Sequence, residues 1–82
     1  MITGKTNIKP TEHYLKYHAA EVRWDLVVKT ILSPTKCRLN KRRGKNRFTY
    51  IKRFKKYVIE LHVEKDLIEE IVWVINAFKI WR

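Results

Sequence analysis

The chain has 82 residues, of which 45% are hydrophobic and 12% aromatic, with only two Gly and two Pro. This length and composition indicate one globular domain over 1–82 and exclude a disordered or low-complexity chain. The 19 Lys and Arg residues against 8 Asp and Glu give a net charge of +11, which predicts an anionic partner, most often nucleic acid.

Targeting and metal signals are absent from the sequence. The longest apolar run, 71–75, is too short to span a membrane, and the N-terminal stretch MITGKTNIKP has no apolar signal segment. We therefore expect a cytoplasmic protein without a membrane partner. The single Cys37 fits a reducing compartment, and with three separated His residues it forms no zinc pattern, so no metal and no other cofactor is predicted.

Two helices are expected in the first half of the chain. Residues 1–9 are polar and are expected to be loose. Apolar residues at helical spacing then predict a helix over 11–22, with Thr11 as its N-cap. A second helix is predicted after Asp25, its candidate cap, and Ser33-Pro34 ends it.

After Pro34 the apolar period changes to two, which is typical of strands. We expect strands over 36–40, 47–54, 57–64 and 68–80, with a glycine-containing loop over 41–46. The last segment is apolar on both faces, which favours a central strand, although a C-terminal helix is the alternative. The predicted fold is α+β, with two N-terminal helices packed on a curled antiparallel sheet of three to four strands.

The positive charge is concentrated in the segment 26–59, which holds 12 of the 19 Lys and Arg residues and no Asp or Glu. A sheet would hold such side chains in rows about 7 Å apart, as a rigid platform for a phosphate chain. Tyr50 could offer a stacking surface for bases, although its place on the other side of the strand from the Arg row favours core packing. The predicted nucleic-acid-binding residues are Arg38, Lys41, Arg42, Arg43, Lys45, Arg47, Tyr50, Arg53, Lys55 and Lys56.

The succession of HYLKYHAAEV, RWDLVVKTILSP, RFTYIKRF, KYVIELHV and VWVINAF over about 11–79 resembles the RelE/ParE toxin-like superfamily. That superfamily also includes barnase-type and EndoU-type ribonucleases. The resemblance implies a toxin-type protein and metal-independent RNA cleavage, in which the ribose 2′-OH attacks the adjacent phosphorus. It also allows for an acidic antitoxin-like protein as partner.

The resemblance carries over to four candidate catalytic residues. His18 matches the helix histidine of the family, a candidate acid or base, and Arg47 and Lys52 match basic strand positions. Asn76 stands where the family has Thr or Ser, and its amide could orient a phosphate but not transfer a proton. Val22 replaces an arginine that is frequent in the family.

Each histidine also has a structural alternative. His18 lies on the apolar side of the predicted helix, where a partly buried structural role is typical. His13 would point about 140° away from His18 on a straight helix, so the two would not form a pair unless the helix breaks. His62 shares a strand face with Glu60 and Glu64, and we expect it to be solvated.

Three functions remain open from the sequence. The first is an RNA-binding protein that cleaves RNA without metal, the second is a nucleic-acid-binding module without chemistry, and the third is an interaction protein that docks an acidic partner along a sheet edge.

Overall fold

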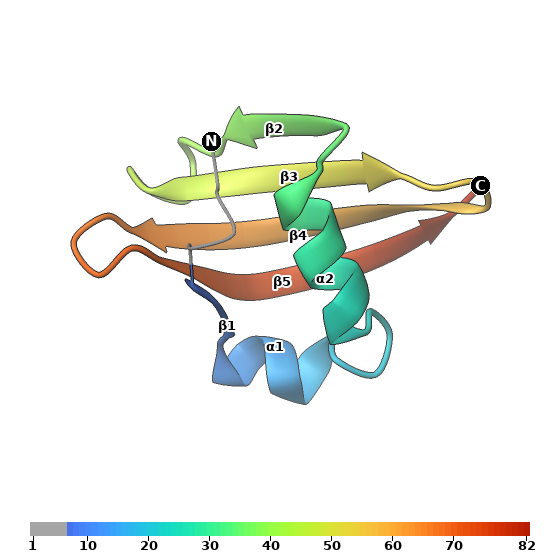
Figure 1. Ribbon diagram of the computed structural model, residues 1–82, viewed down its shortest axis with the longest axis horizontal. Helices are drawn as coiled ribbons and strands as arrows, with labels where there is room; N and C mark the ends of the chain where they lie inside the picture. The colour runs from blue at the N-terminus through green and yellow to red at the C-terminus, as the bar shows by residue number, and fades with distance from the viewer. Residues whose placement is uncertain (1–6) are drawn as a thin grey trace.

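The computed structural model describes residues 7–82, which form one mixed sheet and two short helices (Figure 1). The strands lie in the order β1-β5-β4-β3-β2. Among residues 7–82, no helix has the length and apolar character needed to cross a membrane. The elements are β1 (Asn7–Pro10), α1 (Glu12–Tyr17), α2 (Trp24–Leu32), β2 (Lys36–Leu39), β3 (Arg47–Arg53), β4 (Tyr57–Asp66) and β5 (Ile71–Trp81).

The predicted fold class is wrong in its sheet. The sheet has five strands and is mixed, because β1 pairs parallel with β5 while the other neighbours are antiparallel. Strand β1 was expected to be part of a loose segment 1–9, of which residues 1–6 lie outside the described residues. It escapes sequence patterning because it is four residues long and ends in Pro10, a residue that an edge strand tolerates.

Helix α1 is shorter than predicted, since it ends at Tyr17 and not near residue 22. Thr11 is confirmed as its N-cap: Oγ1 accepts a hydrogen bond from the Tyr14 amide at 3.2 Å and donates one to the Val74 carbonyl at 2.8 Å. Beyond Tyr17 the chain turns back, and the Tyr14 hydroxyl donates to the Val22 carbonyl at 2.6 Å. The apolar spacing of Val22 therefore reflects a turn folded onto Tyr14.

The two helices lie differently on the sheet. Helix α2 crosses one face, whereas α1 lies beside the edge formed by β1 and β5 (Figure 1). Arg23, not Asp25, occupies the N-cap position of α2, and Asp25 lies in its first turn. The core between α2 and the sheet consists of side chains at most 2% exposed, among them Val27, Ile31, Ile59, Leu61, Val63 and Val74.

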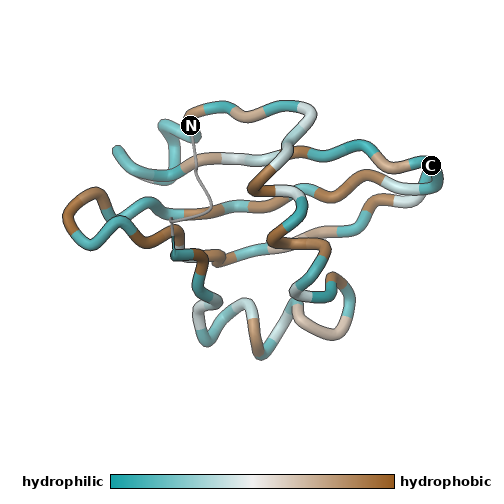
Figure 2. Tube along the Cα trace, viewed as in Figure 1, coloured by the Kyte–Doolittle hydropathy of each residue, from teal (hydrophilic) through white to brown (hydrophobic). Residues whose placement is uncertain are grey.

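The strand alternation assigns the two faces of β4 as predicted. Ile59, Leu61 and Val63 are fully buried on the α2 side, while Glu60 and His62 point to the opposite side, which we call the open face. The apolar last segment is confirmed as a central strand, β5, between β1 and β4. Its start is later than expected because 67–70 form a turn with Leu67 and Ile68 exposed at the hydrophobic tip seen in Figure 2.

A β-bulge decides which face Asn76 occupies. The pairing of β4 with β5 shifts between His62 and Val63, so that His62 lies opposite Asn76 and Val63 lies opposite Val74. Ile75 is the extra residue between them. Val74 therefore points into the core, while Asn76, two positions later, is brought to the open face beside His62.

Candidate active site

A single row of side chains crosses the open face from β2 to β5. Arg38 lies opposite Thr49, Thr49 opposite His62, and His62 opposite Asn76. Directly opposed residues on one face have Cβ atoms roughly 4.5–5.5 Å apart. The sheet therefore sets a cation, a hydroxyl, an imidazole and an amide side by side, although they come from residues up to 38 positions apart in the chain.

Four side chains on the open face form a continuous hydrogen-bonded chain, which we call the Glu60–His18 chain. His62 Nε2 lies 3.0 Å from Glu60 Oε2, and His62 Nδ1 lies 3.2 Å from Asn76 Nδ2. On its other side, Asn76 Oδ1 lies 3.1 Å from His18 Nε2. His18 is the C-cap residue of α1, so the end of that helix delivers the last member of the chain.

With Asn76 Oδ1 toward His18 and Nδ2 toward His62, one arrangement of protons satisfies all three contacts of the Glu60–His18 chain. Asn76 Nδ2 donates a hydrogen bond to His62 Nδ1. Neutral His62 therefore carries its proton on Nε2, which donates a hydrogen bond to the Glu60 carboxylate. His18 Nε2 donates to Asn76 Oδ1. All three donors thus point toward Glu60, and neutral His18 has its lone pair on Nδ1.

The Glu60–His18 chain is largely withdrawn from water. His18 is 9% exposed and the His62 side chain is 19% exposed. Among residues 7–82, no buried side-chain nitrogen or oxygen lacks a hydrogen-bond partner. Hydrogen bonds in such surroundings are stronger than in water and hold side chains in one orientation, so the imidazole of His18 is pre-positioned.

Aromatic rings extend the site from the sheet to α1 in a connected series, which we call the ring series. The centroid distances are 4.9 Å from Tyr17 to His13, 5.2 Å from His13 to His18, 5.2 Å from His18 to Phe78, and 5.5 Å from Phe78 to His62. His13 and His18 were predicted to lie apart unless the helix breaks between them, and the helix does break there. The helix ends at Tyr17, and His18 has left helical geometry with φ −124°.

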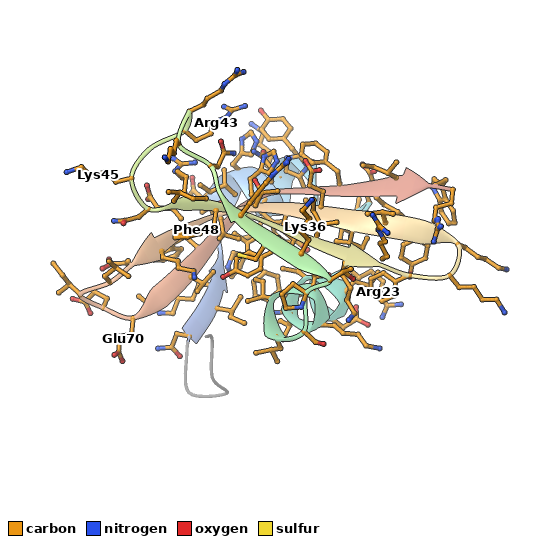
Figure 3. All side chains as sticks on the ribbon, turned by 90° about the horizontal axis from the view of Figure 1, so that it is seen from above. Arg23, Lys36, Arg43, Lys45, Phe48 and Glu70 are labelled. Carbon is orange, nitrogen blue, oxygen red and sulfur yellow. The ribbon has the colours of Figure 1, made fainter. Side chains whose placement is uncertain are left out.

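Two arginines flank the His62–Asn76 pair on the side away from α1. Arg43 and Arg47 line one shallow pocket together with His62 and Asn76. Arg47 also pairs with Glu64, with Nε 3.1 Å from Oε1. Figure 3 shows Arg43 rising on the side of the sheet opposite α2, from the hydrophilic loop 40–46 that is also visible in Figure 2.

The predicted catalytic set is only partly brought together. His18, Asn76 and Arg47 meet at the open face, but Lys52 lies on the α2 side, opposite Ile59. Its Nζ donates to the Ser33 carbonyl at 2.6 Å, just past the end of α2. Lys52 therefore contacts the helix C-terminus and does not reach the Glu60–His18 chain.

Tyr50 does not offer the stacking surface that its sequence position suggested. It lies on the α2 side opposite Leu61 and is 3% exposed, so its alternative role in the core is the one observed. Burial, and to a smaller extent the neighbouring Cys37 thiol, raise the pKa of the Tyr50 phenol.

The remaining predicted cations divide into two groups along β3. Arg53 shares the open face with Arg47 but lies six residues away, about 20 Å along the strand. The exposed residues Lys55 and Lys56 follow it in the turn before β4. At the other end, the loop and β2 contribute the exposed residues Arg38, Lys41, Arg42, Arg43 and Lys45. Of these, Arg43 lines the pocket at His62 and Asn76, whereas Lys41 and Lys45 line a different hollow.

Sequence reasoning missed four members of the site. His62 was expected to be solvated, which is wrong because it is a partly buried link between Glu60 and Asn76. The signal was present: Glu60 and His62 are two positions apart on one strand face. Phe78 and His13 carried no such signal, since the bulge and the early end of α1 bring them to the site.

Within the described residues 7–82, no three His, Cys, Asp or Glu side chains are gathered in a way that could hold a metal ion. The Glu60–His18 chain instead joins two imidazoles to the Glu60 carboxylate through the Asn76 amide.

Comparison of the chain with protein-family models, with curated proteins and with solved structures finds no match. The resemblance to the RelE/ParE superfamily stays a prediction, and the functional proposal rests on the geometry of the open face.

Proposed function

We propose that this protein binds RNA on the open face of its sheet and cleaves it by metal-independent transesterification. The observation that supports this most directly is the Glu60–His18 chain, which lies beside Arg43 and Arg47. An oriented imidazole next to a cationic pocket is what attack by a ribose 2′-OH on its own phosphate requires.

The proposed reaction uses two imidazoles. His18 Nδ1 takes the proton of the 2′-OH as the O2′–P bond forms. His13, whose ring centroid is 5.2 Å from that of His18, gives a proton to the 5′-oxygen as the P–O5′ bond breaks. The products are a 2′,3′-cyclic phosphate and a 5′-hydroxyl, so atoms and protons balance without a co-reactant.

The neighbouring groups have supporting roles. Arg43 and Arg47 stabilise the negative charge that grows on the pentavalent phosphorus, as guanidinium groups do at phosphoryl centres. Glu60, His62 and Asn76 act through His18 and are positioning residues, because they fix its tautomer and its orientation.

The experiment is incubation of the purified protein with end-labelled RNA in the presence of EDTA. Wild-type protein should yield fragments that end in a 2′,3′-cyclic phosphate. The His18→Ala variant should bind RNA with unchanged affinity but cleave it roughly 10²- to 10⁴-fold more slowly. Lys29→Ala on α2, away from the open face, is the control and should behave as wild type. RNA that stays intact but bound would refute cleavage and leave a nucleic-acid-binding module.

One observation favours a second function, the docking of an acidic antitoxin-like peptide along β2. This edge strand is only four residues long, all of them exposed, and within residues 7–82 no strand pairs with its outer side. Lys36 and Arg38 on it would attract an acidic strand that extends the sheet. This separate site would be supported if binding of an acidic peptide increases the β-strand content and does not displace RNA from Arg43.

A further inference from the structure

We infer that Tyr17, beside His13, forms a nucleobase-binding subsite, and that the substrate is therefore single-stranded RNA. This inference rests on the proposed function, because it specifies which form of RNA the open face takes. It follows from the ring series, whose inner members belong to the Glu60–His18 chain and whose outer members lie on α1.

Tyr17 is a large ring left in solvent at the end of a helix. It is the last residue of α1 and is 61% exposed, whereas Tyr14 on the same helix is 1% exposed. A single exposed aromatic side chain is ordinary. Tyr17 differs because its ring touches His13, which in turn touches His18, so an uninterrupted path of ring contacts joins it to the proposed base.

The charge around Tyr17 suits a nucleotide. Lys16 Nζ lies over the Tyr17 ring, 5.4 Å from its centroid, so a base that stacks on this face displaces the ammonium group and leaves it free to meet the phosphate of the same strand. Aromatic platforms with interspersed cations are the common means by which proteins hold single-stranded nucleic acid.

The two flanks of the site therefore differ in chemistry. On the β3 side, Arg43 and Arg47 lie beside His62 and Asn76, and the charge of their guanidinium groups suits a phosphate. On the α1 side, next to His13, lies the exposed ring of Tyr17, which suits a base. A strand crossing from one flank to the other would set a base on Tyr17 and an adjoining phosphate at His18.

Duplex RNA would not satisfy this arrangement. Its bases are stacked on one another within the helix, and its deep, narrow major groove does not admit a side-chain platform. A base can stack on Tyr17 only where it is unpaired. The subsite thus selects single strands or loops without requiring any sequence-specific hydrogen bond.

The test measures binding alone, with a short 2′-O-methyl RNA that lacks the attacking hydroxyl and is not cleaved. Fluorescence anisotropy would give the affinity of wild type for this strand, for its duplex, and for versions that carry one abasic position while keeping every phosphate. Wild type should prefer the single strand, and one abasic position should weaken binding by roughly 5- to 100-fold.

The variants assign that loss to a residue. Tyr17→Ala should weaken binding of the intact strand by the same roughly 5- to 100-fold. In this variant, the abasic position that weakens binding to wild type should cause no further loss of affinity. Tyr17→Phe should keep wild-type affinity. Trp81→Ala is the matched control, because Trp81 is similarly exposed, at 67%, and lies opposite Tyr57, outside the ring series.

The outcomes separate the two proposals. If wild type binds the single strand and Tyr17→Ala binds all strands equally well, the subsite does not exist while RNA binding stands. Equal affinity for duplex and single strand also overturns the inference. If wild type binds no RNA in dilute buffer, the proposed function fails and the inference fails with it.

Discussion

Asn76 lies directly opposite His62 on the open face, with Nδ2 3.2 Å from His62 Nδ1, and this contact exists because Ile75 bulges out of β5. Counting alternate residues from Val72 and Val74 would place Asn76 in the core. Bulges frequently re-aim side chains near functional sites, and here one extra residue connects the sheet to the histidine of α1.

The charge of Glu60 should matter for cleavage and not for binding. Glu60→Gln keeps the shape of the side chain but removes the carboxylate that accepts the His62 proton. A hydrogen bond to a charged group contributes about 1.5–3 kcal/mol, so the single-turnover cleavage rate should fall roughly 10- to 150-fold at unchanged RNA affinity. Glu69→Gln, in the exposed turn before β5, should change neither quantity. A rate unaffected by Glu60→Gln would contradict the role of the chain.

Arg43 should contribute to affinity through phosphate contact. Removing one such contact reduces the steepness of the plot of log affinity against log salt concentration by about 0.7 for a single strand. Arg43→Ala should therefore weaken binding at low salt and flatten the salt dependence by that amount. Lys29→Ala changes the net charge equally but lies on α2, and its slope should match wild type. Equal flattening in both variants would indicate that the open face has no special affinity.

Lys52 should stabilise the fold without touching RNA. Lys52→Met removes the donor to the Ser33 carbonyl, which should lower the free energy of unfolding in urea by about 0.5–1.5 kcal/mol. RNA affinity should change no more than in Lys55→Met, an exposed control that should leave stability unaltered. A loss of affinity comparable with that of Arg43→Ala would instead place Lys52 in the binding surface.

Alkali should destabilise the protein through its buried tyrosines. Burial, with a smaller contribution from Asp25, raises the pKa of Tyr14, and burial raises that of Tyr50. The folded state holds these protons more tightly than the unfolded state, so their contribution is complete below the ordinary tyrosine pKa of about 10 and is lost as the pH rises above it. Urea denaturation from pH 8 to 11 should show the free energy of unfolding falling, and Tyr14→Phe should reduce this dependence.

Residue type and spacing alone predict the local features of this protein. Period-two alternation placed Ile59, Leu61 and Val63 on the buried side of β4. It also placed Arg47 and Arg53 on the face of β3 that points away from Tyr50. Thr11 capped α1 as its side chain predicts, and the β-branched run after Ile71 became a central strand. These features follow from side-chain type and spacing within about ten residues.

The tertiary structure alone decided where the site lies. The pairing of β1 with β5, the end of α1 at Tyr17 and the bulge at Ile75 each depend on segments about 60 residues apart or on a local break in periodicity. No characteristic residue type in the sequence marks the position of such a break. His18, His62 and Asn76 therefore meet because the sheet brings distant segments together, and no spacing among them predicts that contact.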